Sequence, residues 1–356
     1  MNETRTRLDP TLGLPRITEG IPGLGGQIRQ AIDDFVVMEE PLYEPAGEGE
    51  HIYLRITRRN QTTRDLVLDL GRLLGLKDSA IGVAGQKDRA ARTTQTISLH
   101  MPKADVDDVC RRVQDELDVS IESAARHLNK LRMGHLASNR FVITVRNLQD
   151  ESSDRLRQRL EAKLEAIRER GMPNYFGPQR FGRDGDNAER GRRVLEGRER
   201  AKGWLRRLLI SAFQSELFNG WLAARIRDGL FDSLMEGDLA SPRGSHGVFT
   251  TEEVEREQAR CAAGEIDVTG PLFGKKMARA TGPAGDREKA ILREAGITEA
   301  LFEDRDCDGG RRAARVFPKD LRYEFTGEIL ELDFSLPPGS FATAFLREIQ
   351  GPMASL

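Results

Sequence analysis

The sequence predicts an α+β protein, and three observations support this class. Short runs alternate apolar and polar residues as half-buried strands do, for example at Ile52, Leu54 and Ile56. Longer segments repeat leucine at helical spacing, as at 62–73 and 152–167. The length of 356 residues exceeds the usual size of a single hydrophobic core, so we expect two domains.

Strands are expected where apolar residues alternate or gather between turn residues. The segment 34–39 follows a glycine-rich stretch, 80–84 and 94–99 flank a polar loop, and 141–145 alternates Phe, Ile and Val. The segment 328–336 partly doubles its apolar positions, as a strand covered on both faces does.

Helices are expected where apolar residues share one face behind a capping residue. Thr62 or Thr63 can cap the helix at 62–73, and Ser152 or Ser153 the helix at 152–167. Further helices are expected at 104–117, 204–221, 286–300 and from residue 340 onwards. The stretch 236–285 is rich in Gly and Pro, so we expect loops there.

These elements predict a discontinuous first domain. The strand at 328–336 closes it, so residues 1–169 and 315–356 are expected to form one domain with 170–314 inserted. The insertion is expected to be rich in helices.

The composition is that of a soluble globular protein, with 38% hydrophobic and 31% charged residues. No apolar run reaches eighteen residues and the first residues lack the apolar core of a signal peptide, so we expect a cytoplasmic protein without a membrane partner. Cys110, Cys261 and Cys307 are far apart and have no nearby His, which indicates reduced thiols and no metal site.

The charge distribution is local rather than global. A net charge of −2 argues against a protein that coats nucleic acid by bulk charge. Residues 180–207, however, contain ten Arg or Lys against five Asp or Glu, with Phe181 and Trp204 among them. Arg192 and Arg193 in this basic segment are candidate RNA contacts, although a solvated helix face in an arginine-rich chain would look the same.

A polar loop at 85–95 is the strongest candidate for chemistry. Asp88 stands between Lys87 and Arg89, and neighbouring cations keep a carboxylate ionised. An ionised Asp can act as a nucleophile or base. The simpler alternative is a hairpin turn whose charges are solvated.

Five stretches of the chain together resemble the tRNA pseudouridine synthase D (TruD) family. They are the loop residues Gly85, Lys87, Asp88, Arg89, Ala91, Thr93 and Gln95, and the segments 35–39, 139–141, 174–182 and 339–343. They follow the family's order over nearly the whole chain. One position departs from the pattern, because Ile32 stands where the family usually has Pro.

The resemblance implies a pseudouridine synthase catalytic domain, with a mostly antiparallel mixed sheet flanked by helices, and an inserted helix-rich domain. The implied reaction isomerises a flipped-out uridine of tRNA, uridine 13 of the D arm, and needs no cofactor. A cleft between the domains would hold the RNA. The expected partner is tRNA, without a nucleotide cofactor, and we expect a monomer.

The resemblance also implies site residues. Asp88 is the catalytic nucleophile or base, and Phe35, Asn139 and Phe341 are matched substrate contacts. Supporting roles are expected for Arg29, Lys87 and Phe141, and an RNA contact for Arg180. Whether Asp88 attacks the ribose, attacks the base or removes a sugar proton stays open.

Two alternatives from other functional classes remain open. The first is a non-catalytic RNA-binding protein on a synthase scaffold. The second is a glycoside hydrolase, which needs a second carboxylate to work with Asp88, and none stands out in the sequence. Partial matches to a calcium loop at 304–309 and to a phosphate loop at 270–276 lack required ligands, so we set both aside.

Overall fold

A computed structural model describes residues 10–87, 89–148, 152–245, 247–303 and 307–351. The chain forms two compact units, each built from separate segments. The sheet unit comprises Gly26–Asp154 and Pro318–Gly339, and the helical unit comprises Met1–Gly25, Arg155–Phe317 and Ser340–Leu356. These units have other limits than the domains expected from the sequence. The expected domain division at 169/170 and 314/315 stays a prediction.

The sheet unit is built on a nine-stranded sheet with the strand order β14-β15-β7-β2-β5-β3-β6, while β1 pairs with β7 and β4 with β5. The strands are β1 (Gly25–Gln27), β2 (Phe35–Pro41), β3 (His51–Arg59), β4 (Ile81–Val83), β5 (Arg92–His100), β6 (Val119–His127), β7 (Leu136–Leu148), β14 (Lys319–Thr326) and β15 (Ile329–Leu336). β2 and β5 run parallel. The neighbours β15–β7, β2–β7 and β3–β5 are antiparallel. The predicted α+β class with a mostly antiparallel mixed sheet is confirmed.

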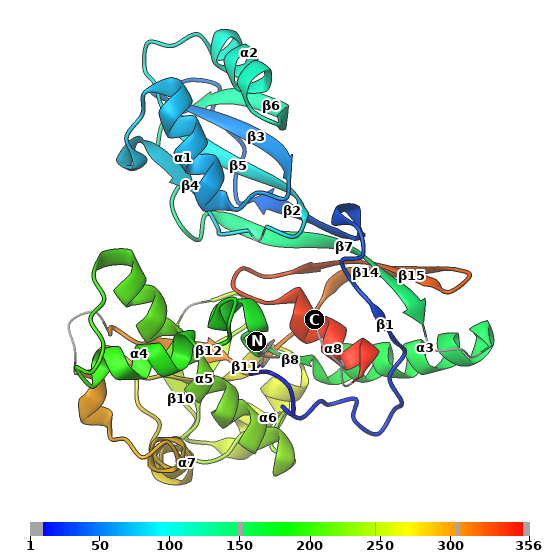
Figure 1. The fold of residues 1–356 in the computed structure, drawn as a ribbon. Coiled ribbons are helices and arrows are strands. Elements are labelled where there is room, and N and C mark those ends of the chain that lie inside the picture. The colour runs from blue at the N-terminus through cyan, green and yellow to red at the C-terminus, as the bar shows by residue number, and fades with distance from the viewer. Residues whose placement is uncertain (1–9, 88, 149–151, 246, 304–306, 352–356) are drawn as a thin grey trace, which may run out of the picture. The chain divides into compact units, whose positions relative to one another are not determined.

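Two helices pack on the sheet: α1 (Thr63–Leu74) lies beside β3, β4 and β5, and α2 (Val106–Glu116) lies beside β6 (Figure 1). Their apolar faces bury Leu66, Leu70 and Val113 in one core with Ile52 and Leu54 of β3. Of the two predicted capping residues, Thr62 caps α1, because its side chain accepts a hydrogen bond from the backbone N–H of Asp65. The same core contains Ile81 of β4 and Ile97 of β5, the two strands that flank the polar loop.

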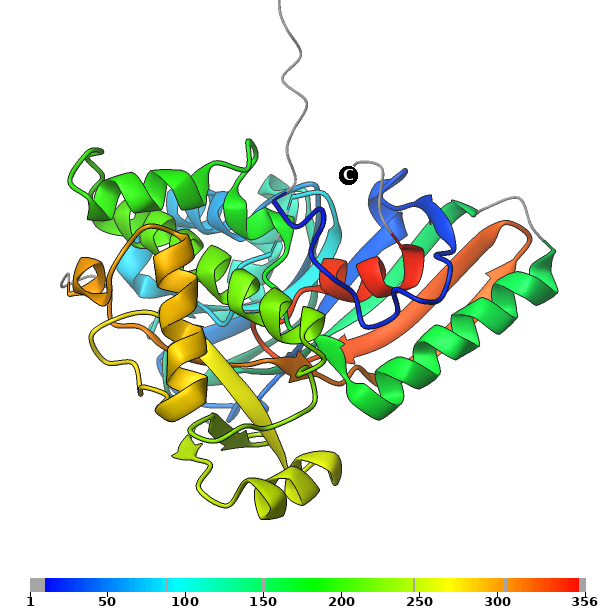
Figure 2. The same cartoon turned by 90° about the horizontal axis from the view of Figure 1, so that it is seen from below.

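The helical unit surrounds the long helix α5 (Gly203–Arg227), which lies beside α4 (Asn187–Leu195) and α7 (Gly282–Glu294) (Figure 2). Its remaining helices are α3 (Ser153–Arg170), α6 (Val254–Ala262) and α8 (Ala342–Gln350). Its sheets are β10-β9-β11-β12 and β13-β8, with β8 (Met172–Pro173), β9 (Leu239–Pro242), β10 (Phe249–Thr250), β11 (Ile266–Leu272), β12 (Gly310–Ala313) and β13 (Arg315–Val316). Short 3₁₀ helices across the chain are η1 (Ile32–Asp34), η2 (Asp78–Ala80), η3 (Pro178–Phe181) and η4 (Glu299–Phe302).

The expectation of a loop-rich stretch at 236–285 is met only in part. Three strands and α6 occupy this stretch. The central strand β11 contains Asp267, Gly270 and Pro271, yet nearly all its residues are buried. Its polar side chains pair inside the unit, so neither alternation nor apolar composition marks it as a strand.

The N-terminal segment of the helical unit is attached to its last helix through buried polar contacts. Glu348 of α8 accepts hydrogen bonds from the backbone N–H of Thr18 at 3.0 Å and from the Thr18 hydroxyl at 2.8 Å. Lys163 of α3 donates to the Glu348 carbonyl at 2.8 Å. Burial lowers the pKa of Lys163 to about 8.

In the part of the chain that the structure describes, no helix has the length and apolarity needed to cross a membrane.

Candidate active site

One face of the sheet unit gathers most of the predicted site residues. In the antiparallel pair of β2 and β7, Glu39 lies opposite Asn139 and Val37 lies opposite Phe141. Directly paired residues point to the same face of a sheet. Phe35, two residues before Val37, therefore shares this face with Glu39, Asn139 and Phe141.

Glu39 is a buried carboxylate at the centre of this face, with an exposed fraction of 1%. One of its oxygens accepts the backbone N–H of Thr96 at 3.2 Å. The other lies 2.8 Å from the Lys87 ammonium. Such a pair is retained inside a protein only when both charges are well hydrogen-bonded, as they are here.

Lys87 connects the loop to the sheet. Its ammonium donates to the Asn139 side-chain oxygen at 2.8 Å as well as to Glu39. Its backbone N–H donates to the Thr63 hydroxyl at 2.9 Å. A Cβ added at Gly85 would lie 3.1 Å from the Lys87 ammonium nitrogen, so glycine leaves room for the ion pair.

A second set of buried hydrogen bonds fixes the start of the loop. Gln95 donates its amide to the Gly85 carbonyl at 2.6 Å, and its side-chain oxygen accepts from Arg58 at 3.1 Å and from Thr63 at 2.9 Å. Burial lowers the pKa of Arg58 to about 10. Three of the motif residues, Gly85, Lys87 and Gln95, thus take part in the contacts that anchor the loop to the sheet.

Asp88, the predicted catalytic residue, lies outside the described residues. The catalytic role of Asp88 therefore stays a prediction.

The aromatic residues of the sheet unit form a stack beside this network. The Arg29 guanidinium lies 4.3 Å from the centre of the Phe35 ring. Phe35 meets Phe141 edge-on at 6.4 Å, and Phe141 stacks on Phe334 at 5.5 Å. Phe35 is only 3% exposed, so most of its surface already has protein partners.

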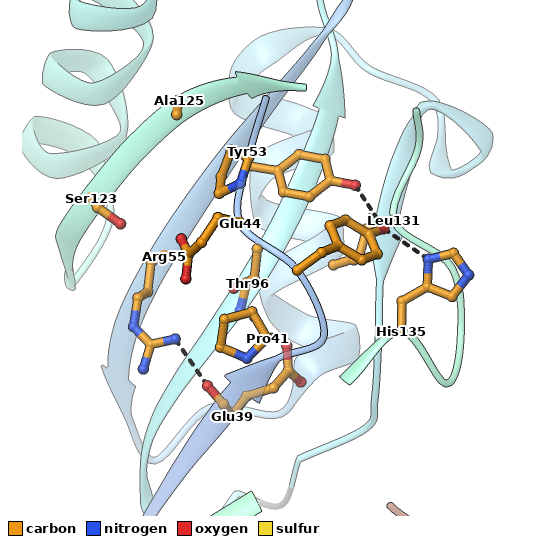
Figure 3. A pocket seen from close by; sticks show the side chains of 12 residues that line it. Glu39, Pro41, Glu44, Tyr53, Arg55, Thr96, Ser123, Ala125, Leu131 and His135 are labelled. Atoms are coloured by element: carbon orange, nitrogen blue, oxygen red, sulfur yellow. Dashed lines mark hydrogen bonds between the residues drawn. The ribbon is translucent and has the colours of Figure 1, made fainter. Parts of the chain in front are cut away.

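Figure 3 shows a small pocket beside Glu39 on the sheet unit. Arg55 donates to the Glu39 carbonyl at 2.9 Å, and the Tyr43 hydroxyl lies 2.9 Å from Nδ1 of His135. The pocket volume of about 60 Å³ is room for a few water molecules rather than for a nucleoside.

The helical unit holds the other predicted residues. Phe341 immediately precedes α8 and meets Phe176 edge-on at 5.8 Å. Arg180 lies on η3, donates to the Ser215 hydroxyl at 3.0 Å and places its guanidinium 5.4 Å from the Phe176 ring centre. Phe176 thus connects these two residues.

Arg192 and Arg193 lie on α4 and are both ion-paired. Arg192 lies 2.9 Å from Glu196, and Arg193 lies 3.1 Å from Glu199. Both pairs are partly exposed, and an exposed pair of this kind stabilises a protein by about 0–1 kcal/mol.

A profile of the tRNA pseudouridine synthase D (TruD) family matches residues 11–202 and 188–349. The chain belongs to the TruD family. Relatives named tRNA pseudouridine synthase D include one from Thermus thermophilus, 41% identical over 94% of this chain and 91% of its own, and one from Anaeromyxobacter dehalogenans, 41% identical over 96% and 98%. A crystal structure of the putative TruD from Methanosarcina mazei is 25% identical, covers 96% of this chain and 97% of its own, and superposes with a TM-score of 0.73.

Membership in the TruD family confirms the family expected from the five motifs and the enzyme class, an isomerase that forms pseudouridine. Sequence reasoning missed Glu39, although one signal was available: Phe35, Val37 and Glu39 alternate on one strand, and a charge on its buried face needs a partner.

Proposed function

We propose that this chain isomerises a uridine of tRNA to pseudouridine, with Asp88 as the nucleophile. Family membership supports the reaction, and the observation that carries the site is the buried junction of Lys87, Glu39 and Asn139 under the loop. By family resemblance the target is uridine 13 of the D arm. We also propose that the enzyme acts as a monomer in the cytoplasm.

The reaction is balanced without a co-reactant. The bond between N1 of uracil and C1′ of ribose breaks, the base turns, and a bond forms between C5 and C1′. C5 loses a proton and N1 gains one, so no electrons and no phosphoryl group are transferred. We therefore propose that no cofactor takes part.

Lys87 and Arg29 have different roles in this proposal. The Lys87 ammonium already donates to two acceptors, which suits a residue that fixes the loop. We assign to Arg29, which lies over Phe35, the cation that keeps Asp88 ionised. Asn139 is proposed to contact the polar edge of the uracil, and Phe35 and Phe341 its faces, with Phe141 supporting Phe35.

The test is Asp88→Asn, which removes one negative charge at nearly constant shape. The product has the mass of the substrate, so pseudouridine is detected by carbodiimide labelling and primer extension. We expect loss of isomerisation with tRNA affinity retained. Asp78→Asn, which removes an exposed acid from the same unit, is the matched control.

Two results would contradict the proposal. Undiminished activity of Asp88→Asn would rule out Asp88 as the nucleophile. A wild-type protein that binds tRNA and forms no pseudouridine would favour the non-catalytic alternative. A transcript with cytidine in place of uridine 13 tests the position, because product that persists on it would place the target elsewhere.

A further inference from the structure

Arg312 on β12 lies in an unusual environment for a cation. Its guanidinium is 4.0 Å from the centre of the Phe176 ring and 5.5 Å from that of Phe218. It donates to the Asn174 carbonyl at 3.0 Å and to the Asn174 side-chain oxygen at 2.6 Å. These acceptors and rings are neutral, so they orient the cation without balancing its charge.

Arg180 is the charged neighbour that acts most on Arg312, and it is also a cation. Burial lowers the pKa of Arg312 to about 9, with the positive charge of Arg180 as the second cause. Burial also lowers the pKa of Arg180. Two like charges held close together away from solvent destabilise the unit unless an anion neutralises them.

Among the described residues, neither Arg180 nor Arg312 has a carboxylate partner. Other buried arginines of the same unit do. Arg311, the residue before Arg312, lies 2.7 Å from Glu288, and Arg315 lies 2.6 Å from Asp267. Arg311 and Arg315 are thus neutralised within the unit, whereas Arg180 and Arg312 have no counter-charge among the described residues.

Arg180 also has N–H groups that no acceptor among the described residues engages. Within the described residues, Nε of Arg180 donates to the Ser215 hydroxyl at 3.0 Å, and its two terminal nitrogens have no hydrogen-bond acceptor. A guanidinium that is fixed through Nε and whose two terminal nitrogens have no acceptor among the described residues is suited to bind a phosphate.

The arginine pair lies next to Phe341. Phe176, over which both guanidiniums lie, meets Phe341 edge-on at 5.8 Å. A Cβ added at Gly177, just before η3, would lie 3.1 Å from the Phe341 ring. The turn that carries Arg180 is thus packed directly against the proposed substrate contact.

We propose that Arg180 and Arg312 together bind one phosphodiester of the RNA, adjacent to the nucleotide that Phe341 contacts. This inference rests on the proposed function for the identity of the ligand. The two guanidiniums bind the phosphate oxygens, and the phosphate supplies the negative charge that the unit lacks. Phe176 keeps both arginines in place between binding events.

The test combines protein variants with chemically altered RNA. Each phosphodiester of a short tRNA-derived substrate is replaced in turn by an uncharged methylphosphonate, and equilibrium affinity is measured. Wild type should lose about tenfold in affinity or more at one position, as expected for a charge-assisted contact. Arg312→Met, which keeps an apolar side chain over Phe176, should show little further loss at that position.

Arg180→Met should lose sensitivity at the same phosphate. Arg293→Gln, which removes an exposed charge from α7, should keep the wild-type pattern. Arg312→Lys retains the charge without the planar fork and is expected to be intermediate. Thermal unfolding of each variant separates loss of the site from loss of the fold.

Two outcomes would overturn the inference. In the first, every methylphosphonate affects wild type and the Met variants equally. In the second, inorganic phosphate at matched ionic strength abolishes the wild-type sensitivity, which would assign the pair to free phosphate instead. Both outcomes are measured as binding, so an inactive wild type would refute the proposed function without affecting this test.

Discussion

Replacing Lys87 with Met should destabilise the sheet unit through the charge that it leaves behind. The side chains of Lys87 and Glu39 are 5% and 1% exposed, so water does not replace the missing ammonium. Glu39 keeps the Thr96 N–H at 3.2 Å and a weak interaction with Gln95 at 3.5 Å. Asn139 loses its only described side-chain donor.

Removing one partner of a buried ion pair costs about 3–5 kcal/mol. The sheet unit spans about 150 residues, for which 1 kcal/mol lowers the melting temperature by about 2–4 °C. The expected decrease is therefore about 6–20 °C. It should be seen in the transition of the sheet unit, followed by circular dichroism or urea unfolding.

The double variant Lys87→Met/Glu39→Gln separates the effect of the unpaired Glu39 charge from the effect of poorer packing. It should be less destabilised than the sum of the single variants, because a neutral amide needs no cation. Arg64→Met is the control, since its pair with Asp78 is exposed and should cost less than about 1 kcal/mol. Single-variant effects that add within about 0.5 kcal/mol would show that the two groups are not coupled and would refute this reasoning.

Three further predictions concern the helical unit. Lys163 has a pKa of about 8 in the fold against 10.5 for the free side chain, so between these pH values the unfolded chain binds the proton and the folded protein does not. The free energy of unfolding relative to Lys163→Met should therefore rise from pH 8 to 10.5, and a flat difference would contradict the lowered pKa of Lys163. Replacing Arg192 and Arg193 with Ala should weaken tRNA binding and reduce the slope of log affinity against log salt by about one for each phosphate that is no longer bound, whereas an unchanged slope would place the RNA elsewhere. Trp204 is 67% exposed and Trp221 is 2% exposed, so tRNA binding should quench the emission of Trp204 and leave a Trp204→Phe variant almost unquenched. Equal quenching of both proteins would exclude an RNA interaction at this residue.

Local patterns predicted the elements that local forces determine. The Thr62 cap and the apolar faces of α1 and α2 were predicted because capping and helical spacing depend on residues a few positions apart. The strand β11 was missed because Asp267 and Thr269 are buried by partners from distant segments. No window of sequence contains those partners.

The same distinction applies to the site. The motifs identified Lys87 and Asn139 as residues, and the structure adds that one ammonium joins Asn139 to Glu39. The role proposed for Arg312 depends on the lack of a carboxylate partner in the described part of the chain and on the Phe176 ring, 136 positions away. Such a relation is visible only once the chain is folded.

The hydrogen bond between Thr18 and Glu348 joins positions 330 residues apart and constrains when the helical unit can be completed. Closing so long a loop carries a large entropy cost, and contacts of this range form slowly. On the ribosome, α3 emerges long before α8 exists, so Lys163 is synthesised well ahead of one of its two partners. We therefore expect burial of this lysine to be among the last events after release of the chain, and the unfinished unit to be a substrate for chaperones until then.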